Sequence, residues 1–370
     1  MVPNILRLLI VSFFTLQTLT YETKEGSYKK VSSYSNQFYG SSATTNNYIF
    51  HEKENIPALY YKKNFKNYKP FYNQKKASSY VNNDFYFRDE DDESNSIESE
   101  EKKFSYDEND DGPAIYGPSN WYKINKQCNG NYQSPIAIDI FNTSGIKFSP
   151  RLYFEGIDIR PSSMKIENNG HSMKITFNLP NNQHIRIIGG PLENIPYILD
   201  SFHWHWGAID KSGSEHVLRG RRYSSELHLV FYNSQYGNFN TASTSSKGLA
   251  VLGILYDVDS QQNGYINPWA TIIHRVLNAK STYVEYQNNF TLRDLIRTDQ
   301  FKYFTYKGSL TTPNCTENVT WLINSKPIPI APAELREFRK LRNEKGEQMF
   351  HNFRPLQYSK YDRKVLIYAQ

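Results

Sequence analysis

Leu199-Asp-Ser-Phe-His-Trp-His-Trp-Gly207 is the stretch from which the fold and the chemistry of this chain can be worked out. Its aromatic residues favour a β-strand, in which residues two apart point to the same face. We therefore expect His203 and His205 to project side by side, with Trp204 and Trp206 on the opposite face. Two imidazoles directed at one point are half of a metal site, although an isolated His-x-His pair is more often two ordinary polar strand residues.

A third histidine is available in the next alternating segment, Ser225 to Phe231. Turn residues around Lys211 to Ser214, followed by a loop, would let this segment return beside the first strand in an antiparallel pair. His228 would then lie next to His203 and His205. Three imidazole donors with an open fourth position form the ligand set of a catalytic zinc site.

The N-terminus has the layout of a secretory signal peptide. Residues 1–20 carry one charge, Arg7, followed by an apolar run from Leu8 to Leu16. This run is too short to span a membrane, and no later stretch approaches the required length. We expect a secreted, extracellular protein with no membrane span.

Cysteine and sequon content agree with that compartment. The two cysteines, Cys128 and Cys315, would most simply form one disulfide in an oxidising environment, the alternative being two separate buried thiols. Four Asn-x-Ser/Thr triplets could carry glycans, and they begin at Asn142, Asn289, Asn314 and Asn318. Because Asn314 and Asn318 lie close to the predicted site, we expect only one of these two to be glycosylated. The candidate glycan acceptors are therefore Asn142, Asn289 and Asn318.

The whole chain has a net charge of +6, and residues 21–103 differ in composition from the rest. Up to about Arg88 they are rich in Tyr, Asn, Ser and Lys, and an acidic run follows from Asp89 to Glu101. Such a stretch buries too little apolar surface to offset its ordering entropy, so we expect a disordered extension. It is either a solvated linker or a contact site for matrix, mineral or a polyanion. Secretion argues against a nucleic-acid partner.

Residues 104–370 contain short alternating and apolar segments between turn signals, as expected for strands. Helical periodicity is convincing only in Pro268 to Leu277 and in Pro332 to Arg342. The predicted fold is mostly β (α+β), with a large, mainly antiparallel central sheet and a few peripheral helices.

Several separate segments, in the right order, resemble one known family. They are Phe104-Ser105-Tyr106, Gly117-Pro118, Trp121, Cys128-Asn129-Gly130, Gln133 to Ile136, Asn168-Asn169-Gly170-His171, Gly189 to Leu192, Phe202 to Gly207, Gly213 to His216, Glu226 to Val230, Leu249 to Gly253, Gly308 to Pro313, Trp321 and Asn352 to Pro355. Together they resemble the alpha-class carbonic anhydrases of the secreted type, with Phe104 where the family has Trp. The resemblance spans residues 104–370 and nothing before them.

The resemblance implies a zinc lyase, a carbonate dehydratase, that reversibly hydrates carbon dioxide to bicarbonate and a proton. His203, His205 and His228 would bind Zn²⁺, and zinc-bound hydroxide would attack carbon dioxide. His171 occupies the position of the family's proton shuttle, a role that requires a group titrating near neutral pH. An alternative is a non-catalytic binding or extracellular-matrix module on the same fold, in which zinc histidines are usually lost.

The resemblance also assigns the residues around the ligands. Glu226 would accept the spare N–H of His228, and Asn352 belongs to the same surroundings. Ser201 stands where the family has a Gln that supports the first histidine, and the shorter side chain puts metal affinity in doubt. Thr311 would donate its hydroxyl proton to Glu215 and so orient the hydroxide.

The remaining assignments concern the substrate pocket and the disulfide. Substrate-binding positions, mainly an apolar wall for carbon dioxide, are Thr312, Val230, Val251, Leu310 and Trp321. Family members of the secreted type pair cysteines placed like Cys128 and Cys315, which implies a disulfide that fixes the loop of Thr311. The predicted domains are a signal peptide, 1–20, a disordered extension, 21–103, and a catalytic domain, 104–370.

Overall fold

The computed structural model describes two strands near the N-terminus, Thr15–Glu22 and Tyr28–Ser35, and most of the chain from residue 101 onward. In that second part the described ranges are 101–139, 143–145, 151–259, 272–285, 290–296, 301–359 and 363–368. The chain divides into two units, Met1–Glu93 and Ser94–Gln370.

In the first unit, β1 (Thr15–Glu22) pairs antiparallel with β2 (Tyr28–Ser35), with Leu19 opposite Val31. The sequence pattern predicted no strands here. The rest of the signal peptide predicted for residues 1–20, and nearly all of the extension predicted for residues 21–103, lie outside the described residues. These two boundaries stay predictions.

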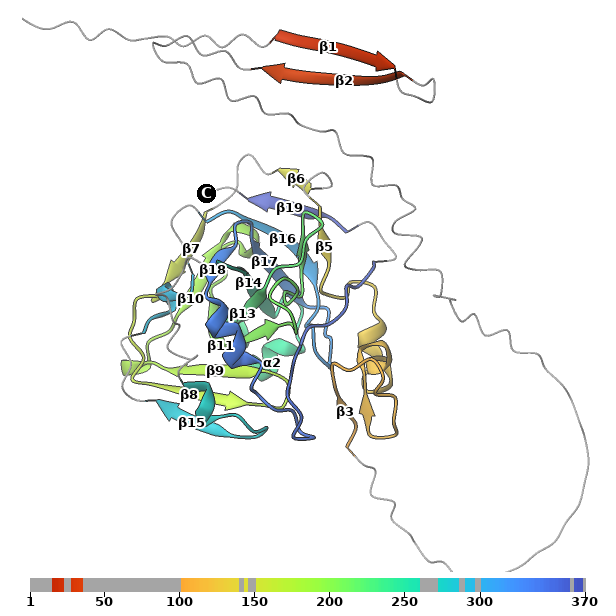
Figure 1. Cartoon of the computed structure of the whole chain (residues 1–370). Helices are drawn as coiled ribbons and strands as arrows, with labels where there is room; N and C mark the ends of the chain where they lie inside the picture. The colour runs from red at the N-terminus through yellow and green to blue at the C-terminus, as the bar shows by residue number, and fades with distance from the viewer. Residues whose placement is uncertain are drawn as a thin grey trace, which may run out of the picture. The chain divides into compact units, whose positions relative to one another are not determined.

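The second unit is built on a mixed sheet of 13 described strands, whose central members run through the middle of the domain in Figure 1. Its main path is β15 (Thr282–Glu285), β8 (Ser163–Asn168), β9 (Met173–Asn178), β11 (Tyr197–Trp206), β13 (Ser225–Asn233), β14 (Leu249–Val258), β17 (Val319–Asn324), β16 (Tyr303–Gly308), β19 (Val365–Tyr368) and β6 (Thr143–Gly145). Three further strands extend it: β10 (Arg186–Gly189) pairs with β11, β7 (Leu152–Glu155) pairs with β10, and β18 (Ile328–Ile330) pairs with β14.

Most neighbours in this sheet are antiparallel, as predicted, but three pairs are parallel: β14 with β17, β14 with β18, and β19 with β6. Two small parallel pairs lie outside the main sheet. They are β3 (Lys103–Phe104) with β4 (Ile115–Tyr116), and β5 (Ala137–Ile138) with β12 (Val217–Leu218). The predicted fold class, mostly β with a large central sheet, is confirmed.

Helices are short and peripheral. The two α-helices among the described residues are α2 (Phe239–Ser243) and α4 (Pro332–Phe338). Pro332 opens α4 as predicted, but the helix ends four residues before Arg342. Of the helix predicted for 268–277, residues 268–271 lie outside the described ranges. In the described part, Ile272 is α-helical and is followed by the 3₁₀ turn η7 (Ile273–Arg275).

Six further 3₁₀ turns connect the elements. They are η1 (Pro118–Lys123), η2 (Lys126–Asn129), η4 (Pro180–Asn182), η5 (Gly190–Leu192), η6 (Ser234–Tyr236) and η8 (Leu292–Asp294). None of the helices in the described ranges has the length and apolar character that crossing a bilayer requires.

The central strands are buried on both faces, and this sorts their side chains into two apolar clusters. Trp204 and Trp206 of β11 are fully buried in the larger cluster, together with Leu227 and Leu229 of β13. The opposite face of β13 carries Glu226, His228 and Val230, and Val230 belongs to the second cluster. The period of two therefore separates the larger apolar cluster from the histidine-bearing face, as the sequence predicted.

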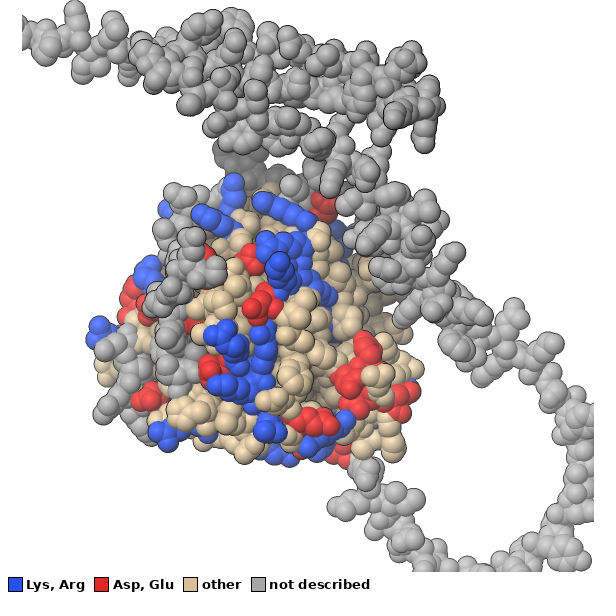
Figure 2. Space-filling model, viewed as in Figure 1, with Lys and Arg blue, Asp and Glu red and all other residues tan. Residues whose placement is uncertain are grey.

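Charge is unevenly distributed over the second unit. Asp107, Glu108, Asp110 and Asp111 make the segment beside β3 acidic. Figure 2 shows Asp and Glu gathered at the lower right, where Figure 1 labels β3, and Lys and Arg over much of the remaining visible face. This acidic segment is held to the body of the unit partly by ion pairs, one of which joins Asp110 to Lys345 at 2.8 Å.

Candidate metal centre

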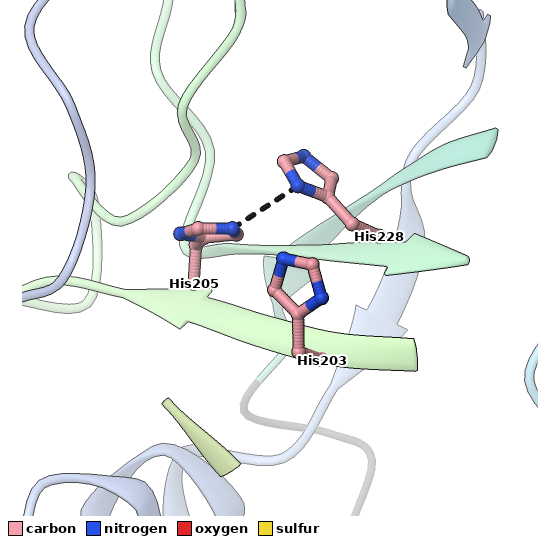
Figure 3. A group of neighbouring side chains, drawn as sticks. All are labelled: His203, His205 and His228. Carbon is pink, nitrogen blue, oxygen red and sulfur yellow. Dashed lines mark hydrogen bonds between the residues drawn. The ribbon is translucent and has the colours of Figure 1, made fainter. Parts of the chain in front are cut away.

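The three histidines come together because of the register between β11 and β13. His203 lies opposite His228, and His205 lies opposite Glu226 in the antiparallel pair. One ring nitrogen from each of His203, His205 and His228 lies within 4.8 Å of the other two. Figure 3 shows the three rings converging from the two strands, as the sequence predicted.

Hydrogen bonds behind two of the rings fix which nitrogen of each ring carries a proton. His205 Nδ1 lies 2.7 Å from the carbonyl oxygen of Asn352, which can only accept, so Nδ1 is the donor. His228 Nε2 lies 2.9 Å from Glu226 Oε1, and a carboxylate likewise accepts. Each neutral ring has only one N–H, and it is used on the side away from the cluster.

The two nitrogens that face each other, His205 Nε2 and His228 Nδ1, are 3.0 Å apart, as the dashed line in Figure 3 marks. Because each ring uses its N–H elsewhere, both nitrogens present a lone pair. Burial and the neighbouring His228 lower the pKa of His205, against an opposing effect of Glu215, so adding a proton there is unfavourable. A cation held between the rings resolves this conflict, and the donor set therefore fits Zn²⁺.

Glu226 is the centre of a buried hydrogen-bond network behind the ligands. Oε1 accepts from His228 Nε2 and from His216 Nδ1 at 2.7 Å, while Oε2 accepts from the His216 backbone N–H at 2.8 Å. Burial opposes ionisation, yet the electrostatic interactions with His216 and His228, and the hydrogen bonds that both rings donate, hold the pKa of Glu226 well below its usual range. The carboxylate is therefore ionised and acts as an acceptor toward His228, as predicted from its position.

His216 belongs to the surroundings of the candidate metal centre, and the sequence analysis gave it no role there. Its Nε2 lies 2.6 Å from the Tyr306 hydroxyl, which lies 2.9 Å from Ser134 Oγ. The network thus connects the histidine cluster to β16 and to the N-terminal part of the domain. The sequence feature that could have identified His216 is its position next to Glu215 in the Gly213–His216 motif. Nothing in the sequence pattern indicated that its ring would contact Glu226 and Tyr306.

Glu215 is fully buried between the ligands and Arg354. Its Oε1 accepts the Arg354 backbone N–H at 2.8 Å, and its carboxylate lies 3.6 Å from His205 Nδ1 and 3.9 Å from His228 Nδ1. Oε2 is buried with no hydrogen-bond partner among the described residues. The predicted bond from Thr311 to Glu215 is not formed in the described part of the chain, although Thr311 is also buried.

Ser201 and Asn352, both assigned to the surroundings of the ligands, differ in what they do. Ser201 Oγ donates to Asp200 Oδ2 at 2.8 Å, and among the described contacts none joins it to His203. Asn352 binds the C-terminal end of β11 with both polar atoms of its side-chain amide. Oδ1 accepts the Trp206 N–H at 2.7 Å, and Nδ2 donates to the Trp204 carbonyl at 2.8 Å. The first ligand, His203, is thus the least supported of the three.

The predicted apolar wall forms one surface beside His228. Val230, Val251 and Trp321 belong to the same buried cluster, and Leu310 packs against it. The Trp321 ring centroid lies 4.8 Å from that of His228, which puts the wall in contact with the ligand set. Thr312 is half-buried in the adjoining loop, where its carbonyl accepts the Cys315 N–H at 2.7 Å.

A disulfide joins Cys128 to Cys315, as the resemblance implied. Among the candidate glycan acceptors, Asn142 and Asn289 lie outside the described residues. Asn318 Nδ2 donates to the carbonyls of Ala242, Ser243 and Ser245 at 2.9–3.1 Å, around the end of α2. A glycan on this nitrogen would disrupt these bonds, so we no longer expect Asn318 to be modified in the folded protein.

His171, the candidate proton shuttle, is stacked on an aromatic ring. Its centroid lies 3.7 Å from that of Phe104, with 17° between the ring planes. Burial, together with Lys103 and against the opposing effect of Glu344, lowers the pKa of His171 to about 4. In this stacked orientation the imidazole is neutral near neutral pH.

Comparison with known proteins gives a consistent result. Residues 116–369 match the family described as eukaryotic-type carbonic anhydrase. A mouse protein named carbonic anhydrase 7 is 36% identical over 251 residues, covering 65% of this chain and 90% of the mouse protein. Its human counterpart is 35% identical over 247 residues, with the same coverage.

Proposed function

The chain belongs to the eukaryotic-type carbonic anhydrases and is therefore a carbonate dehydratase, and we propose that it performs this reaction with Zn²⁺ held by His203, His205 and His228. The observation that carries the proposal is the pair of facing lone pairs on His205 Nε2 and His228 Nδ1, 3.0 Å apart. Two outward N–H donors create that arrangement, and it is unfavourable without a cation. Bound zinc lowers the pKa of a coordinated water to about 7, the value for which carbonic anhydrase is itself the reference case.

The protein's own groups would prepare the site for attack on carbon dioxide. Glu226 and the Asn352 carbonyl hold the tautomers of His228 and His205, so the donor atoms stay directed inward. Thr311 would donate its hydroxyl proton to Glu215 Oε2, the buried oxygen that has no partner in the described residues, and so orient the attacking water.

The apolar wall would hold carbon dioxide, a small nonpolar substrate. Val230, Val251, Leu310 and Trp321 present no charge to the substrate, and Trp321 uses its only N–H on the Ser309 carbonyl at 3.0 Å. The wall would therefore exclude extra water without competing for the nucleophile.

His171 would carry the released proton to buffer. Its position after Asn168-Asn169-Gly170 supports this role, whereas its stacked, partly buried ring is unsuited to accepting a proton at neutral pH. We therefore propose that His171 acts when its ring leaves Phe104.

Stopped-flow hydration of carbon dioxide by the zinc-loaded protein tests the whole proposal, with an aromatic sulfonamide as inhibitor. We expect inhibitable activity that is lost when zinc is removed and restored when it is returned. Absence of inhibitable activity in zinc-loaded protein would leave the non-catalytic binding module as the remaining function. All three ligands, Thr311 and Glu215 are present, so no observation favours that alternative.

We also propose that the protein is secreted and that residues 21–103 contact matrix, mineral or a polyanion. The signal-like residues 1–20 and the disulfide support secretion, and the charge blocks of the extension support such contacts. Binding of the full-length protein and of a 104–370 variant to heparin and to calcium carbonate can be compared. Equal binding would reduce the extension to a linker.

A further inference from the structure

The loop that carries Thr311 is tied at both ends to one short buried segment, Gln133-Ser134. At the start of the loop, Ser309 Oγ accepts the Ser134 N–H and Ser134 Oγ accepts the Ser309 N–H, both at 3.0 Å. At its end, Gln133 Nε2 donates to the Cys315 carbonyl at 3.1 Å. The place of the Thr311 loop in the domain therefore depends on where residues 133–134 lie.

The same segment is bound by the guanidinium of Arg354, whose side chain is buried. Nη1 donates to Gln133 Oε1 at 2.9 Å and to the Ser134 carbonyl at 2.8 Å, and Nη2 donates to the Cys128 carbonyl at 3.0 Å. Nε has no hydrogen-bond partner in the described part of the chain. The hydrogen bonding of the guanidinium there consists of these three contacts, and two of them are made to the segment that anchors the loop.

The main chain of Arg354 contacts the other partner of the predicted Thr311 bond. Its N–H donates to Glu215 Oε1 at 2.8 Å, while Glu215 Oε2 is the oxygen to which Thr311 would donate. One residue thus binds Glu215 with its backbone and the anchor of the Thr311 loop with its side chain. A displacement of Arg354 would therefore change the distance between the carboxylate and the threonine.

We propose that Arg354 and Gln133 are positioning residues that set the distance between Glu215 and Thr311, and that the Cys128–Cys315 disulfide acts on the site through them. Each half of the disulfide has its carbonyl bound by one of the two side chains, Cys128 by Arg354 and Cys315 by Gln133. The inference rests on the proposed function, because the Thr311–Glu215 pair serves that reaction. Arg354 and Gln133 act through this pair rather than on the substrate.

Two variants interrupt the connection at different points. Gln133→Met keeps the length of the side chain but removes the acceptor for Arg354 and the donor to Cys315. Arg354→Lys keeps the positive charge and the backbone N–H, but an ammonium cannot reproduce the planar fork of donors. Both variants therefore weaken the connection without removing Glu215 or Thr311.

Asn233→Leu is the matched control. Asn233 lies at the end of β13 and is 2% exposed, against 3% for Gln133. Its Oδ1 accepts the Gln235 N–H at 3.0 Å and its Nδ2 donates to the Lys247 carbonyl at 3.3 Å. Replacing it thus removes a buried side-chain amide that shares no hydrogen-bond partner with Gln133.

The measurement independent of activity is amide hydrogen exchange in the metal-free, full-length protein. The Arg354 N–H is bound to Glu215, and the Cys315 N–H to the Thr312 carbonyl at 2.7 Å, so both report on the site. Their rates are divided by that of Leu252 in β14, which corrects for global stability. We expect these ratios to rise about 5- to 150-fold in Gln133→Met, the cost of an unpaired buried donor, and to rise in Arg354→Lys. Asn233→Leu should keep the wild-type ratios, and wild-type ratios in both test variants would overturn the proposal.

A double-mutant cycle tests the link to the disulfide, with kcat/KM for carbon dioxide hydration measured on full-length zinc-loaded protein. Replacing both cysteines by Ser should lower kcat/KM about 10- to 100-fold, as expected for misplaced catalytic groups. In the Gln133→Met background this loss should shrink to within about twofold, whereas in Asn233→Leu it should stay at the wild-type size. An equal loss in all three backgrounds would refute transmission through Gln133. Absence of hydration activity in the wild type would instead count against the proposed function, while the exchange rates would still decide the positioning role.

Discussion

Replacing Glu226 by Gln tests the tautomers on which the metal centre depends, because it keeps the shape of the side chain and removes its charge. In the native protein three N–H groups converge on the carboxylate: His216 Nδ1–H and His228 Nε2–H on Oε1, and the His216 backbone N–H on Oε2. A Gln side chain can offer only one oxygen. Its NH₂ group must therefore face at least one of these donors in a fully buried site.

Two magnitudes follow from this geometry. Leaving one buried donor without an acceptor costs about 1–3 kcal/mol, and this should appear as lower stability of the metal-free protein. Loss of the charged acceptor behind His228 should weaken zinc binding about 10- to 100-fold, which corresponds to about 1.4–2.8 kcal/mol. Stability and affinity should thus fall by comparable amounts.

Urea unfolding of the metal-free protein and competition with a chromogenic zinc chelator measure the two effects separately. Glu347→Gln is a suitable control, because Glu347 is an exposed residue whose carboxylate accepts from Asn343 Nδ2 at 3.1 Å. Wild-type affinity and wild-type stability in Glu226→Gln would refute the assigned tautomers, and with them the argument from facing lone pairs.

Three further predictions concern stability. The folded pKa of His171, about 4, lies below the unfolded value of 6.5, so stability present above pH 6.5 is lost as the pH falls toward 4, by about 3 kcal/mol. Urea unfolding of His171→Gln should show a shallower pH dependence over this range. Asn318→Ala should cost about 1–3 kcal/mol in the same assay, and peptide mass spectrometry should find Asn318 unmodified. Replacing Cys128 and Cys315 by Ser opens a loop with a sequence separation of 187 and should cost about 5 kcal/mol, seen as a lower urea midpoint.

The convergence of the three histidines could be predicted from the sequence because it depends on a period of two. Alternation in Phe202 to Trp206 puts the histidines on one face and the tryptophans on the other, and burial of both tryptophans then fixes the register. Glu226 follows from the same rule, since it lies two residues from His228. Local pattern was sufficient wherever the functional residues share a strand face.

Contacts between distant segments could not be predicted in this way. His216 meets Tyr306 across 90 positions, and the stack of Phe104 on His171 depends on how the N-terminal segment packs against residues 343–351. Ser201 shows that some contacts between adjacent residues could not be predicted either. Its hydroxyl donates to the neighbouring Asp200, and strand alternation does not determine that hydrogen-bond partner. The parallel partners of β14 were likewise missed, since they are brought in from far along the chain.

That parallel pairing of β14 with β17 has a consequence for the order in which the site assembles. The three histidines lie on two strands that are consecutive in the main sheet and close in sequence, so the cation-binding strand pair can form from local contacts alone. The strand that carries Trp321 pairs with β14 across a long intervening segment, and such contacts form late in folding because loop closure must come first. Zinc added to the unfolded chain should therefore be bound before the apolar wall closes beside it. When refolding is monitored by metal uptake, the observed rate should be higher than when it is monitored by tryptophan fluorescence.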